Sequence, residues 1–204
     1  MLRKTALVIS VLFHPLVLPL YGFLFILNND LMLSLMSIKG KIYLSSSVAI
    51  GMVVLPALLV PLYRYLQLIS SYLMEKREER YLPLTVTLGL YILTYFFLNR
   101  LPVSSVVPGF ALGACIAITI NLFVLLRWKI SSHAIAVGGL VGTVLVLFSL
   151  NPLISPLWVA AAFIIAGLVG TARLLLNAHT PAQVYVGFFT GLIIMATVMS
   201  VFSF

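Results

Sequence analysis

The sequence predicts an all-α membrane protein, a polytopic bundle of about seven transmembrane helices, with six as the alternative count. Of its 204 residues, 63% are hydrophobic and 8% are charged, whereas soluble domains carry about 25% charged residues. The mean hydropathy is +1.22, and apolar runs of about 20 residues, the length that crosses a bilayer, recur along the chain. We therefore expect one integral membrane domain, residues 1–204, in the cytoplasmic (inner) membrane of a bacterium.

Seven apolar segments are separated by charged residues, asparagine or proline. The first follows Met1-Leu2-Arg3-Lys4, which begins like a secretory signal. Its apolar run is too long for a signal and has no clear cleavage site, so we interpret it as an uncleaved span. The predicted spans are residues 5–27, 42–66, 83–99, 104–127, 133–150, 157–176 and 183–203.

Small residues four apart in three of the spans favour close helix packing, because glycine lets two backbones approach each other. The same pattern serves packing inside one chain and between chains, so it leaves the oligomeric state open. The pairs are Gly109 with Gly113, Gly138 with Gly142, and Gly187 with Gly191.

The charges of the chain exclude several classes of function. The formal net charge is +8, but the basic residues come in ones and threes between apolar runs, without the basic stripe of a nucleic-acid-binding protein. An anionic or phosphorylated membrane lipid is the expected partner. Cys115 is the single cysteine, so no intrachain disulfide forms. The sequence has no carboxylate or histidine cluster typical of a metal site, and we expect no cofactor.

Three polar segments share one side of the membrane, because two crossings separate each from the next. They precede the third and fifth spans and connect the sixth to the seventh. They hold most of the cationic groups and two of the three histidines, which is typical of a site for a multiply charged anion. The candidate site residues are Lys76, Arg80, Lys129, Ser131, Ser132, His133, Arg173, His179 and Gln183.

These residue types fit phosphate chemistry. Cleavage of a phosphate ester or anhydride needs charge neutralisation, an in-line nucleophile and a proton for the leaving oxygen. Imidazole serves as nucleophile or as proton donor, so His133 and His179 are candidates for the two tasks. His179 precedes Thr180-Pro181, an N-cap and first helical position where a phosphate is favoured. Arg173 is placed for bidentate phosphate contact.

The pattern resembles the type 2 phosphatidic acid phosphatase superfamily, membrane enzymes that remove phosphate from lipids without a metal. Its third motif, Ser-Arg, five residues, His, three residues, Asp, is matched by Ala172–Gln183. Its second, Pro-Ser-Gly-His, is matched loosely by Ile130–His133. Its first, Lys, six residues, Arg-Pro, is degenerate in Lys76–Pro83. The resemblance covers a phosphatase-like core of about residues 65–195.

The resemblance implies a role for each residue. His179 would be the nucleophile that forms a phosphohistidine, and His133 would be the acid that protonates the leaving group. Ser132 replaces the family's glycine, so its backbone N–H alone carries over, whereas the Ser131 hydroxyl is a further donor to phosphate. The phosphate-binding set is then Arg173, Lys76, Arg80, Lys129, Ser131 and Ser132.

Gln183 stands where the family has an aspartate that orients the nucleophilic histidine. A glutamine amide accepts a hydrogen bond from imidazole but supplies no charge. Thr180-Pro181-Ala182-Gln183 is also a capping box, so Gln183 orients His179, closes the start of the helix, or does both. Glutamine at this position is similar to the dolichyl diphosphate phosphatase branch, which favours a polyprenyl diphosphate substrate.

The expected function is a lipid phosphate or diphosphate phosphatase. Two alternatives stay open: a catalytically weak relative that binds phospholipid headgroups, and a small transporter with the polar residues along its path. Structural roles compete at single residues. Arg173 and His179 suit an interfacial position, Ser131 and His133 a helix start, and Lys76–Arg80 a solvated face with helical ion pairs.

His14 precedes Pro15 inside the first expected span. By the span count it lies too deep for the surface site, and we interpret it as a bundle-facing polar residue near a kink. The positive-inside rule does not orient the protein, because most cations on the site side are those that a phosphate site needs.

Overall fold

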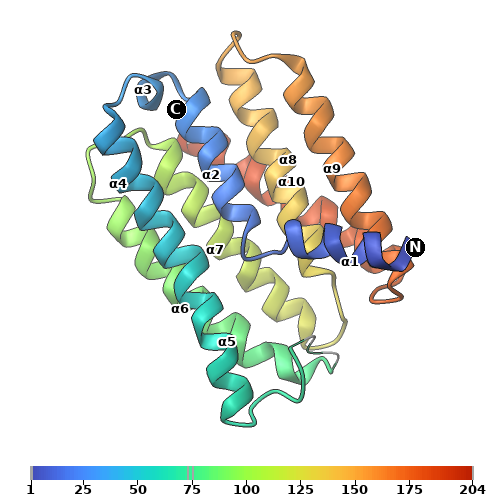
Figure 1. Cartoon of the computed structure of the whole chain (residues 1–204). Coiled ribbons are helices and arrows are strands. Elements are labelled where there is room, and N and C mark those ends of the chain that lie inside the picture. Colours follow the sequence, from blue (N-terminus) through green and yellow to red (C-terminus); the bar gives the residue numbers. More distant parts are fainter. Residues whose placement is uncertain (1, 73, 75, 204) are drawn as a thin grey trace.

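The computed structural model describes residues 2–72, 74 and 76–203, and its regular structure there is entirely helical (Figure 1). This confirms the predicted all-α bundle. Six helical segments are long and apolar enough to cross a membrane. They are α4–η1–α5 (Ile38–Ala49, Ile50–Val54 and Leu55–Tyr65), η2–α6 (Glu78–Arg80 and Tyr81–Leu98), α7 (Val106–Leu125), α8 (Ser132–Leu150), α9 (Pro156–Leu175) and α10 (Pro181–Phe202).

The first expected span, residues 5–27, is two short helices, so six long spans are present rather than seven. The two short helices are α1 (Leu2–Leu12) and α2 (Leu18–Asn29), and the short α3 (Leu31–Ser34) follows. The break falls at Pro15, which has no N–H to donate and disfavours helical backbone at the residue before it. Figure 1 shows α1 crossing α8 and α9, whereas α2 runs along the bundle.

The predicted site segments lie at one end of the bundle. The start of α6, the start of α8 and the connection from α9 to α10 gather at the lower end in Figure 1, and the C-terminus lies at the opposite end. At that opposite end, the Ser104 hydroxyl donates to Asp30 at 2.9 Å and the Asn151 amide donates to the Asn29 carbonyl at 2.8 Å. These bonds join the connections far from the site.

Glycines bring α8 and α10 into backbone contact. A Cβ at Gly138 would collide with the Phe188 carbonyl, and a Cβ at Gly191 would collide with the Ile135 carbonyl. This is the close approach that the four-residue spacing predicts. It also joins the helix starts, because the backbone N–H of Ser131 donates to the Gln183 carbonyl at 3.3 Å.

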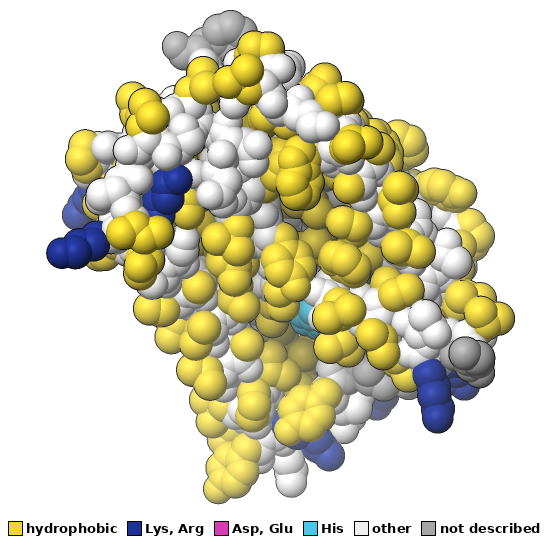
Figure 2. Space-filling view, turned by 45° about the horizontal axis from the view of Figure 1, so that its top comes forward, with side chains coloured by type: hydrophobic (Ala, Val, Ile, Leu, Met, Phe, Trp, Pro, Cys, Tyr) yellow, Lys and Arg dark blue, Asp and Glu magenta, His cyan; other side chains and the backbone are white. Residues whose placement is uncertain are grey.

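Hydrophobic side chains cover much of the outer surface (Figure 2). Leu93, Ile164 and Phe123, each on a spanning helix, are 66%, 63% and 68% exposed. A soluble monomer rarely exposes so continuous an apolar surface. Together with the six apolar spans, this surface identifies a membrane protein.

Candidate functional site

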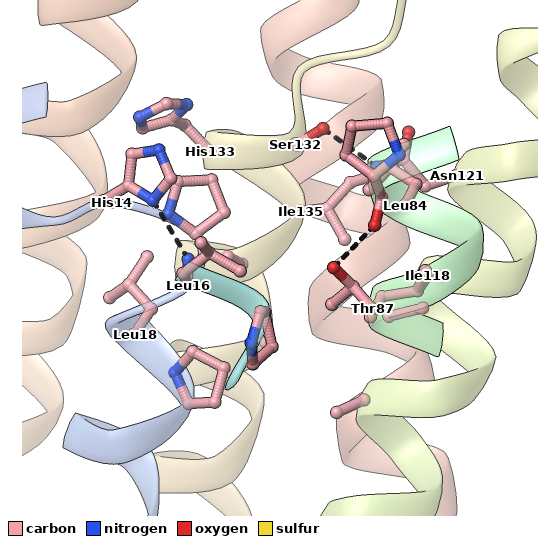
Figure 3. Close-up of a pocket in the computed structure, with 18 of the residues that line it drawn as sticks. His14, Leu16, Leu18, Leu84, Thr87, Ile118, Asn121, Ser132, His133 and Ile135 are labelled. Atoms are coloured by element: carbon pink, nitrogen blue, oxygen red, sulfur yellow. Dashed lines mark hydrogen bonds between the residues drawn. The ribbon is translucent and has the colours of Figure 1, made fainter. Parts of the chain in front are cut away.

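A cavity of about 390 Å³ extends from the site end into the bundle. Apolar side chains such as Phe110, Leu140 and Met195 line its interior. Figure 2 shows a histidine side chain in a hollow among hydrophobic side chains, and Figure 3 shows His14, His133 and Asn121 among the residues that line the pocket. The polar side chains along it include Ser10, His14, Arg80, Asn121, Ser132, His133, Arg173 and His179.

His179 lies in the connection between α9 and α10, one residue before the N-cap of α10. Thr180 and Gln183 form the capping box that the sequence predicts. The Thr180 N–H donates to Oε1 of Gln183 at 3.1 Å, which makes that oxygen the acceptor. Nδ1 of His179 lies 3.1 Å from the same oxygen, so Nδ1 carries the proton and Nε2 keeps its lone pair. Gln183 therefore both caps the start of α10 and orients His179.

The surroundings of His179 favour neutral imidazole. Burial is the main cause that lowers its pKa from 6.5 to about 4, while the bond to Gln183 acts in the opposite direction. The positive charges of Arg173, Arg80 and Lys129 lower the pKa further. At neutral pH the ring is uncharged, and an uncharged imidazole is the nucleophilic form.

His133 is held at the start of α8. The Ser131 hydroxyl caps this helix by accepting from the Ala134 N–H at 3.4 Å. Nε2 of His133 lies 3.1 Å from the backbone carbonyl of Ser10. Because a carbonyl only accepts hydrogen bonds, Nε2 carries the proton and Nδ1 is the nitrogen available for proton exchange.

Asn121 of α7 forms a hydrogen bond with Ser132, the residue before His133. Its amide nitrogen donates to the Ser132 hydroxyl oxygen at 2.9 Å (Figure 3). Asn121 is 3% exposed, and its Oδ1 has no hydrogen-bond partner among the described residues. A buried amide oxygen is costly without a donor, so this atom is suited to meet a donor group within the cavity.

Arg80 and Arg173 supply positive charge, and neither forms an ion pair with a carboxylate among the described residues. Among the described residues the one ion pair joins Arg77 to Glu78, at 3.6 Å. Arg80 donates through Nε to the Met74 carbonyl at 2.9 Å. Arg173 donates through Nη1 to the Ser10 hydroxyl at 3.3 Å, and its buried Nε has no partner in the described chain. Two guanidinium groups in this state favour an anion.

The remaining candidates lie outside the cavity lining. Lys76 is exposed, and Ser131 is buried as a helix cap. Lys129 is near enough to affect the pKa of His179. The expected charged helix face is an irregular stretch followed by the short 3-10 turn η2, from which Arg80 reaches the cavity. Glu75, part of this charge run, lies outside the described residues.

His14 belongs to the site, so the prediction that it lies too deep is wrong. The break before Pro15 brings the end of α1 to the cavity, and the rings of His14 and His133 meet edge to face with centroids 5.4 Å apart. Burial lowers the pKa of His14, and the charge of Arg173 adds to this. Sequence reasoning missed Ser10 altogether. The His14-Pro15 pair, which predicts a chain break, was the available signal.

Known proteins give no assignment for this arrangement. A comparison of the chain with protein-family models, curated protein sequences and solved structures finds no match. In the described part of the chain, no three His, Cys, Asp or Glu side chains gather as a potential metal site.

Proposed function

We propose that the protein is a metal-independent phosphohydrolase that acts on a phosphorylated membrane lipid, either a lipid phosphate or a polyprenyl diphosphate. The observation that carries the proposal is the setting of His179. Its imidazole is neutral, its Nδ1 is bound to Gln183, and Arg173 and Arg80 line the same apolar cavity. An apolar chain suits the cavity interior, and a phosphate suits its cationic end. The proposed location is the cytoplasmic membrane of a bacterium.

In the proposed reaction, Nε2 of His179 attacks phosphorus and the bond to the leaving oxygen breaks. His133, protonated on Nδ1 while its Nε2–H stays on the Ser10 carbonyl, gives the Nδ1 proton to that oxygen, which belongs to a lipid alcohol or to a lipid monophosphate. Water then attacks the phosphohistidine and gives a proton to His133, releasing inorganic phosphate and free His179. Arg173 and Arg80 neutralise the phosphate oxygens as charge shifts among them.

A second candidate, a protein that binds phospholipid headgroups without hydrolysis, is favoured by Gln183. A neutral amide orients His179 but gives less stabilisation to a cationic imidazole than a carboxylate does. The same cavity and cations serve binding alone. Phosphorylation of His179 separates the two functions.

The test is phosphate release by detergent-purified protein from phosphatidate, phosphatidylglycerophosphate and polyprenyl diphosphate, with EDTA present. We expect His179→Ala to abolish release while lipid binding stays, because the variant lacks only the nucleophile. Arg173→Ala should lower release strongly, and Arg100→Ala, which removes an exposed arginine outside the cavity lining, is its matched control.

Acid-labile, alkali-stable labelling by a ³²P-labelled lipid, present in the wild type and lost in His179→Ala, would identify the phosphohistidine. Release that survives His179→Ala would refute the nucleophilic role. Lipid binding without release would favour the second candidate.

A further inference from the structure

Ser10 connects two candidate functional side chains that are far away in the sequence. It lies on α1 and is 6% exposed. Its hydroxyl accepts a hydrogen bond from Nη1 of Arg173 at 3.3 Å, and its carbonyl accepts one from Nε2 of His133 at 3.1 Å. These partners belong to α9 and α8, so one residue of α1 contacts both helices.

The end of α1 makes the Ser10 carbonyl available. In a continuing helix this carbonyl would accept from the N–H of His14. Here the His14 N–H turns to the Val11 carbonyl at 3.3 Å, because the chain breaks before Pro15. The last carbonyls of a helix need other donors. His133 satisfies Ser10, and the Tyr21 hydroxyl donates to the Leu12 carbonyl at 3.3 Å.

The Ser10 hydroxyl limits the freedom of Arg173. An arginine side chain loses much rotamer entropy when it is ordered, and a buried acceptor on one Nη holds its planar group in place before a ligand binds. Nε of Arg173 then has no hydrogen-bond partner among the described residues. His14, at the end of the same segment, packs its ring against His133 and so confines the second candidate residue.

We propose that Ser10 is a positioning residue of the active site: its hydroxyl holds the Arg173 guanidinium for the substrate phosphate. This inference rests on the proposed phosphatase function. It makes α1 a structural part of the site.

Ser10→Thr and Ser10→Val form the matched test, because threonine and valine have the same shape and differ by one hydroxyl. Any packing change is common to both, whereas Ser10→Val alone removes the acceptor of Arg173. We expect Ser10→Val to raise KM for the preferred lipid about tenfold over Ser10→Thr with kcat changed little, since a hydrogen bond to a charged group is lost. Melting temperatures in the same detergent check folding, and Ser10→Ala replaces Ser10→Val if the latter unfolds.

The outcomes separate this inference from the proposed function. An active wild type with equal KM for Ser10→Val and Ser10→Thr would overturn the role of Ser10 and leave the phosphatase intact. If the wild type releases no phosphate from any lipid, the proposed function fails. Binding of inorganic phosphate, measured by calorimetry, then decides about Ser10: about tenfold weaker binding to Ser10→Val supports it, and equal or absent binding overturns it.

Discussion

The contact between His179 and Gln183 determines what the imidazole can do. One oxygen of Gln183 accepts both the Thr180 N–H and Nδ1–H of His179, so the amide cannot be flipped without opposing two donors. The ring is thereby held in the tautomer with a free Nε2. The glutamine supplies geometry, and its neutral amide leaves burial and the nearby cations to keep the pKa low.

Gln183→Glu should raise the pKa of His179 above about 4, because it adds a negative charge 3.1 Å from Nδ1 and keeps the length of the side chain. The neutral nucleophile exists above this pKa and is lost as the pH falls through it. The acid limb of kcat/KM should therefore move to higher pH in the variant. An acid limb at the same pH in both proteins would contradict the role of Gln183, with NMR titration of His179 as the direct check.

At the scale of helices, the contact between α8 and α10 aligns the two histidine-bearing helix starts. Gly138 and Gly191 leave no room for side chains between the backbones. The same contact places Ser131 beside Gln183, through the bond from N–H to carbonyl. Packing deep in the bundle thus determines geometry at the site end.

Gly138→Ala should destabilise the protein by about 1–3 kcal/mol, because the added Cβ meets the Phe188 carbonyl and forces the helices apart. Gly167→Ala is the matched control, since a Cβ there meets nothing within 4 Å, and alanine favours a helix over glycine. Melting in one detergent compares the two. A Gly138→Ala variant as stable as Gly167→Ala would show that the contact is looser than described.

At the scale of the whole molecule, the six long spans place the site at one end and the C-terminus at the other (Figure 1). The first expected span, residues 5–27, forms the two short helices α1 and α2 instead of one long helix. The last span, α10, still runs from the site end to the C-terminal end, as expected. The number of long spans is six and not the expected seven.

Thiol labelling of intact membrane vesicles tests this topology. Ser70→Cys lies after α5 at the site end and Ser34→Cys lies in α3 at the opposite end, and both serines are exposed. A membrane-impermeant reagent should label one variant from outside and the other only after permeabilisation. Native Cys115 is buried, so the wild type provides the unlabelled control. Labelling of both variants from the same side would refute the topology.

Hydropathy and spacing were sufficient for the bundle, for six of its spans and for the common end of the three polar segments, because apolar length and chain order are local properties of a sequence. The capping box of Thr180 and Gln183 was equally readable, since a cap involves residues three apart. The roles of His133, His179 and Arg173 in phosphate chemistry stay predictions.

Only the tertiary structure decided which other side chains contact His133, His179 and Arg173. Pro15 predicted a disturbance of the first span, but not that α1 would turn across α9 and bring Ser10 to Arg173 and His14 to His133. The tertiary structure also placed Arg80 in the cavity lining and left Lys76, four residues earlier, exposed. Such contacts depend on the packing of helices more than a hundred residues apart, and no local pattern in a single sequence contains that information.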